Sequence, residues 1–129
     1  MEDPRQLTER EREVLTFLLG ADFPGVEKLR AQANTARVIG ACECGCATVY
    51  LGVDPSLPTA DEVTQTNAVD ATGLPRADSA PLPDLILFVK DGRLSSVEII
   101  WYGEAPVRDF PTPSEFGAPQ ALWWDADNA

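Results

Sequence analysis

The chain has no histidine among its 129 residues, and it has only three cysteines and one methionine. Without histidine it lacks a Ser-His-Asp triad and a papain-like Cys-His pair, because in both an imidazole takes the proton of the nucleophile. The glycine-rich loop that binds phosphates and the acidic loop that binds calcium are also absent. The sequence therefore favours a non-catalytic protein over an enzyme.

Positive charge is scarce as well. The chain has 10 Lys and Arg against 21 Asp and Glu, which gives a net charge of −11. Nucleic acids and anionic membranes are bound mainly through Lys and Arg, so we expect neither as a partner. The acidic surface leaves two interpretations open: it serves solubility alone, or it binds a protein partner with a basic surface.

Long apolar segments are missing. No stretch has the roughly 20 apolar residues that a membrane helix needs, and the opening MEDPRQLTER lacks the apolar core of a signal peptide. Three cysteines cannot all pair within one chain, which fits a reducing compartment. We therefore expect a cytoplasmic protein, and the length fits a single domain over residues 1–129.

Two helices are expected before any strand. Within residues 7–19, Thr8 and Glu11 have the spacing of a capping box, and apolar residues follow at helical spacing. Pro24 marks the start of a second, shorter helix that ends near Asn34. Both helices have one apolar face, which predicts that they pack on a sheet.

The first expected hairpin contains all three cysteines. Residues 43–45 fit a three-residue loop in which Gly45 takes a positive φ. This register pairs Ile39 with Val49, places Cys42 opposite Cys46 and leaves Cys44 alone in the loop.

The second expected hairpin covers residues 85–102. Asp91 and Gly92 suit a two-residue type I′ turn, and this turn pairs Ile86 with Val97. Both faces of the hairpin are largely apolar, so both need cover. The proline-rich loop, the C-terminal tail or another subunit would cover the face that the helices leave open, and a homodimer is one of these alternatives.

The remaining segments have little regular pattern. Residues 54–83 form a proline-rich loop with a weak strand near 65–71, and residues 105–129 form an irregular tail. The tail contains Trp123 and Trp124, of which at least one should dock on the sheet or on a partner. The predicted fold is α+β: two N-terminal helices packed on an antiparallel sheet of four to five strands, built from two hairpins.

The cysteine segment has three interpretations. Cys42, Cys44 and Cys46 offer thiolates for zinc or another thiophilic metal, although their spacing is shorter than that of zinc sites and Glu43 or another chain would have to supply a fourth ligand. Facing cysteines in a hairpin also lie within reach of a disulfide, which permits thiol redox chemistry. The third interpretation, small thiols that pack a tight turn, needs no cofactor, and the adjacent carboxylate favours it by raising the pKa of the thiols.

An aromatic and acidic group follows the second hairpin. Glu98, Trp101, Tyr102 and Glu104 combine residue types that are enriched at protein contacts with negative charge. The leading hypothesis is therefore a non-catalytic protein-binding module. The alternatives are a metal-binding or thiol-redox protein built on the cysteines, and a small-molecule pocket between the helices and the sheet.

Three segments are similar to a known family: LTEREREVLTFLLGADFPGVEKLR, GACECGCATVYL and GRLSSVEIIWYGEAPVRDFPTP. They resemble small uncharacterised bacterial proteins found largely in actinobacteria. The resemblance implies a cytosolic single domain, and it implies no activity.

Overall fold

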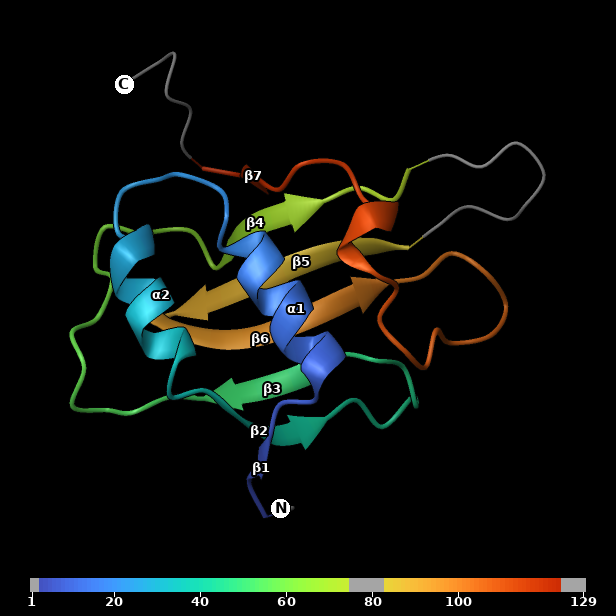
Figure 1. Cartoon of the computed structure of the whole chain (residues 1–129), viewed down its shortest axis with the longest axis horizontal. Helices are drawn as coiled ribbons and strands as arrows, with labels where there is room; N and C mark the ends of the chain where they lie inside the picture. Colours follow the sequence, from blue (N-terminus) through green and yellow to red (C-terminus); the bar gives the residue numbers. More distant parts are fainter. Residues whose placement is uncertain (1–2, 75–82, 124–129) are drawn as a thin grey trace.

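Two helices lie on one face of a seven-stranded antiparallel sheet in the computed structural model, which describes residues 3–74 and 83–123 (Figure 1). The strand order is β1-β2-β3-β6-β5-β4-β7. The elements are β1 (Arg5–Gln6), α1 (Glu9–Leu18), α2 (Val26–Ala33), β2 (Arg37–Ala41), β3 (Val49–Gly52), β4 (Asn67–Ala71), β5 (Asp84–Lys90), β6 (Arg93–Ile100), the 3-10 helix η1 (Pro113–Glu115) and β7 (Gln120–Ala121).

The α+β architecture is as predicted, but the sheet has seven strands instead of four to five. β4 confirms the weak strand expected near residues 65–71. The additional strands are β1 and β7, which form the two edges and have two residues each. Two residues are too few to show an alternating pattern, so the sequence gives no sign of them.

The N-terminal helix begins where its capping residues predict. Thr8 accepts a hydrogen bond from Glu11 N at 3.1 Å, and the Glu11 side chain accepts one from Thr8 N at 2.8 Å. Val14, Leu15 and Leu18 form the buried face of α1. Within the described residues, no helix is both long and apolar enough to span a membrane.

The register of β2 and β3 differs from the prediction. Val38 pairs with Leu51 and Ala41 pairs with Val49, and a bulge lies between Val38 and Gly40. The predicted pairing of Ile39 with Val49 is therefore wrong. The pairs on the loop side of this bulge already differ from the prediction, because the connecting loop extends over residues 42–48 and not 43–45.

The turn of the second hairpin is as predicted, whereas its pairing is not. Asp91 and Gly92 have φ values of 52° and 75°, as a type I′ turn requires. A register shift after Phe88 then pairs Leu87, and not Ile86, with Val97. The shift places Val97 and Ile99 on the same buried face as Leu85 and Leu87.

The buried side contains one polar side chain that joins several elements. Gln32 of α2 is 1% exposed. Its Nε2 donates to Gly92 O at 2.9 Å and to Pro58 O at 3.1 Å, and its Oε1 accepts from Leu94 N at 3.0 Å. These bonds attach α2 to the β5–β6 turn and to the loop before β4.

The opposite side of the sheet, here called the open face, is less covered. Its members alternate with the buried residues of the strands and are half-buried or exposed, apart from buried Ser96: Ile39, Tyr50, Ile86, Phe88, Ser96, Glu98 and Ile100. Ile39 and Tyr50 are 40% and 42% exposed. Apolar residues on both faces were predicted. Trp123 of the C-terminal tail packs edge-on against Phe23 in the core, with ring centroids 5.9 Å apart. Trp124 lies outside the described residues.

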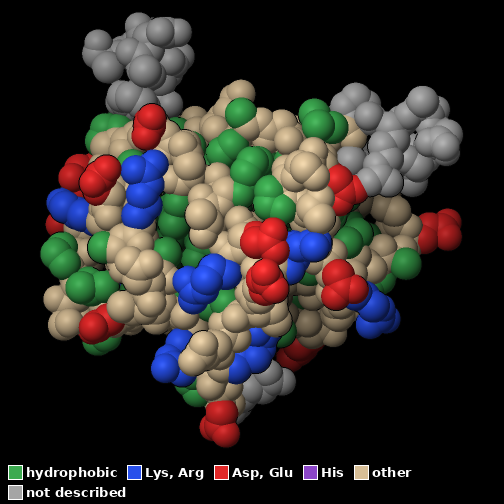
Figure 2. Space-filling view, viewed as in Figure 1, with side chains coloured by type: hydrophobic (Ala, Val, Ile, Leu, Met, Phe, Trp, Pro, Cys, Tyr) green, Lys and Arg blue, Asp and Glu red, His purple; other side chains and the backbone are tan. Residues whose placement is uncertain are grey.

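Charged side chains of both signs are interspersed on the side of the molecule that carries the helices (Figure 2). Several of them form exposed ion pairs, such as Lys28 with Glu62 at 3.1 Å. The excess of negative charge is therefore not concentrated on this face as a single acidic patch.

Candidate functional site

The loop between β2 and β3 is held in shape by backbone hydrogen bonds. Gly45 N donates to Cys42 O at 3.2 Å, which closes a tight turn, and Gly45 has a φ of +87° that glycine adopts readily. Ala47 N donates to Val107 O at 2.8 Å. The loop therefore lies beside the segment that follows β6, at the right of Figure 1.

The turn brings all three sulfur atoms together. Their Sγ atoms lie within 4.8 Å of one another, and those of Cys42 and Cys44 are 2.7 Å apart. Cys46 N donates to the Sγ of Cys44 at 3.4 Å. The prediction that Cys44 stands alone in the loop is therefore wrong, because its sulfur lies beside that of Cys42 and within the same cluster as that of Cys46. All three thiols are free.

The three thiols differ in exposure and acidity. Cys44 is exposed, and its hydrogen bonds with Cys42 and Cys46 raise its pKa to about 11. Burial raises the pKa of half-buried Cys46, but hydrogen bonds from Thr48 and from the other two thiols outweigh this effect and bring it to about 7. The prediction that the thiols all have raised pKa values therefore fails for Cys46.

Residues distant in sequence complete the surroundings of the cluster. The guanidinium of Arg108 lies against the loop, since a methyl group on Gly45 would come within 3.3 Å of its Nη1. Thr48 is buried, and its Oγ1 accepts a hydrogen bond from Ile99 N at 3.0 Å. Sequence reasoning missed both contributions. Arg108 is more than 60 positions from the cysteines, and only the fold brings it near.

The donor set suits a thiophilic ion. Among the residues that the structure describes, these thiols form the one group of three or more His, Cys, Asp or Glu side chains close enough to share a metal. Glu43, proposed as a fourth ligand, does not belong to this group. Thiolate sulfur is a ligand for soft and borderline cations, and the nearby guanidinium would offset part of the negative charge.

The predicted aromatic and acidic surface is dispersed over several environments. Tyr102 is 57% exposed and donates a short hydrogen bond to Asp84, which raises the pKa of the phenol. Glu98 accepts a hydrogen bond from Ser96 at 3.0 Å on the open face. Trp101 is half-buried against the core, and Glu104 is exposed.

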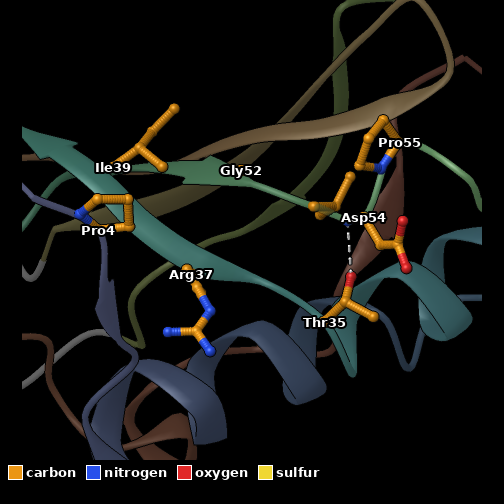
Figure 3. Close-up of a pocket in the computed structure, with 8 residues that line it drawn as sticks. Pro4, Thr35, Arg37, Ile39, Gly52, Asp54 and Pro55 are labelled. Carbon is orange, nitrogen blue, oxygen red and sulfur yellow. Dashed lines mark hydrogen bonds between the residues drawn. The ribbon is translucent and has the colours of Figure 1, made fainter.

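A surface hollow of about 450 Å³ lies at the β1–β2–β3 edge of the sheet (Figure 3). Its lining includes Pro4, Arg37, Ile39 and Pro55, and one of its walls is fixed by a hydrogen bond of 3.0 Å from Asp54 N to the side chain of Thr35. This position is at the rim of the sheet, whereas the predicted small-molecule pocket was between the helices and the sheet. Fully buried leucines occupy that interface.

Comparisons with protein-family models, curated proteins and solved structures give no match. The resemblance to small bacterial proteins therefore stays a prediction. Function has to be inferred from the geometry of the chain itself, and the three-cysteine loop has the most specific geometry.

Proposed function

We propose that the protein binds one thiophilic metal ion through Cys42, Cys44 and Cys46. The observation that supports this function is the convergence of the three Sγ atoms within 4.8 Å of one another. Metal–sulfur bonds of about 2.3 Å place sulfur ligands about 4 Å apart around one ion. Sulfur movements of about 1 Å or less would bring the cluster to this spacing.

The number and type of ligands narrow the choice of metal. Thiolates select Cu(I) and zinc over hard cations. Three thiolates complete a trigonal Cu(I) site, whereas tetrahedral zinc would need a fourth ligand such as water or a carboxylate. We therefore expect the protein to exceed simple thiols in affinity for Cu(I) by a larger factor than in affinity for Zn²⁺.

Metal titration of the reduced protein under anaerobic conditions tests this function. With a competing chelator present, we expect one Cu(I) per chain and a sulfur-to-copper absorption band. Replacement of any one cysteine by serine should weaken binding at least tenfold, which corresponds to about 1.4 kcal/mol. Glu43→Gln is the matched control in the same loop and should leave the affinity unchanged. Equal binding by the wild type and by a triple serine variant would contradict the proposal.

A second candidate function is the binding of a protein partner. It is favoured by the exposed aromatic rings of Tyr50 and Tyr102, which lie near the carboxylates of Glu98 and Asp84. Such a surface suits a partner with basic and apolar residues. The test is a pull-down at low and moderate salt with the wild type and with Tyr102→Ala, combined with sedimentation analysis. A monomer that captures the same proteins with and without the tyrosine would contradict this function.

A further inference from the structure

The sulfurs of Cys42 and Cys44 lie much closer together than the 4.8 Å that bounds the whole cluster. Their Sγ atoms are 2.7 Å apart, so an approach of about 0.7 Å would reach the 2.05 Å of a disulfide bond. The turn closed by Gly45 N and Cys42 O has Cys44 near its centre.

Cys46 is hydrogen-bonded to both other thiols and has further contacts of its own. Its backbone N–H donates to the Sγ of Cys44, and its own thiol is half-buried and hydrogen-bonded to Thr48. Cys44 is exposed, so a small molecule in solution reaches its sulfur first. Cys46 therefore has a contact outside the cluster, with Thr48 just before β3, that holds its sulfur in addition to its contacts with the other two thiols.

We infer that Cys42 and Cys44 form a reversible intrachain disulfide by exchange with a low-molecular-weight disulfide, and that Cys46 stays a thiol. In the first step one thiolate of the pair attacks one sulfur of the small disulfide, whose S–S bond breaks and releases one thiolate. The other cysteine of the pair loses its proton, attacks the protein sulfur of this mixed disulfide and expels the second thiolate. The protein loses two electrons and two protons, and the small disulfide becomes two thiols.

The disulfide would regulate the metal site, and this consequence rests on the proposed function. Oxidation removes two of the three thiolates and leaves Cys46 alone, so the ion should be released. A bound ion should in turn protect the pair, because its ligands are not free to attack a disulfide. Metal binding and oxidation then exclude each other at the same three residues.

Equilibration of the metal-free protein with reduced and oxidised glutathione, in the presence of a chelator, tests the inference. After an acid quench, free thiols are labelled with one alkylating reagent, and the disulfide is then reduced and labelled with a second. Mass spectrometry should find the first label on Cys46 and the second on Cys42 and Cys44. Cys46→Ser should keep this disulfide, whereas Cys44→Ser should lose it.

Two outcomes would overturn the inference: a disulfide that includes Cys46, or glutathione attached to Cys44 with no intrachain bond. Both are measured without metal, so they do not depend on the proposed function. In the companion experiment, Cu(I) should slow the oxidation at least tenfold, and the oxidised protein should bind Cu(I) at least tenfold more weakly. If the disulfide forms as described but the reduced protein binds no metal, the proposed function fails and the inference stands.

Discussion

Replacement of Gln32 by leucine tests how the fold holds its helices to the sheet. Leucine has a similar volume and keeps the helix propensity, but it removes all three hydrogen bonds of the amide. Gly92 O keeps a second donor, Ala60 N at 2.8 Å, and Pro58 is exposed to water. Leu94 N is therefore the group that loses its partner in a buried position.

The expected loss of stability depends on which groups keep a hydrogen-bond partner in the Gln32→Leu variant. A buried donor without a partner costs about 1–3 kcal/mol, and each of the other lost bonds costs about 0.5–1.5 kcal/mol. Burial of the leucine side chain offsets part of the sum. We expect Gln32→Leu to lower the free energy of unfolding by about 2–3 kcal/mol and the melting temperature by about 10 °C.

Urea unfolding followed by far-UV circular dichroism measures this change. Gln6→Leu is the matched control, because Gln6 is exposed in β1 and undergoes the same chemical change at the surface. The control should alter stability by less than about 0.5 kcal/mol. If both variants lose the same stability within this margin, the buried amide does not stabilise the fold as described.

Three further predictions concern other positions. Gly92→Ala should cost about 2–4 kcal/mol, because φ is +75° and the new methyl group would lie 2.8 Å from a side-chain carbon of the adjacent loop. Gly103→Ala, with nothing within 4 Å, is its control, and equal melting temperatures would refute the steric argument. Burial raises the pKa of Glu11, but hydrogen bonds from Arg5 and Thr8 hold it below its ordinary value of 4.5. Ionised Glu11 therefore stabilises the native state above pH 4.5. The wild type should exceed Glu11→Gln in free energy of unfolding by about 1 kcal/mol at pH 7, and this difference should shrink as the pH falls below 4.5. A difference in unfolding free energy that is constant with pH would contradict this. Thr48→Val should raise the pKa of the Cys46 thiol in the metal-free protein above its value of about 7. Thiolate absorbance follows this titration, and an unchanged pKa would show that the Thr48 hydroxyl does not lower it.

Local signals in the sequence predicted local structure well. The capping box of Thr8 and Glu11 located the start of α1, and the type I′ turn at Asp91 and Gly92 located the second hairpin. Each of these features depends on residues within three positions of one another. Backbone geometry at that range is determined largely by the residues themselves.

The errors arose in strand pairing. A bulge between Phe88 and Val89 changed the partner of Val97, and a connecting loop longer than three residues changed the partner of Val49. A bulge is stabilised by the packing of the finished sheet, which a single strand does not encode. The cluster of sulfurs lies in this longer loop, and for this reason the sequence suggested one facing pair of cysteines where the structure has three converging thiols.

The two short edge strands restrict how copies of the chain associate. β1 follows Pro4 and β7 follows Pro119, and each strand has only two residues. Proline has no N–H to donate, and a strand of two residues offers few free backbone groups to a further strand. Growth of the sheet from chain to chain, which leads to aggregation, is therefore hindered at both ends. Contact through the side chains of the open face does not depend on free backbone groups at these edges.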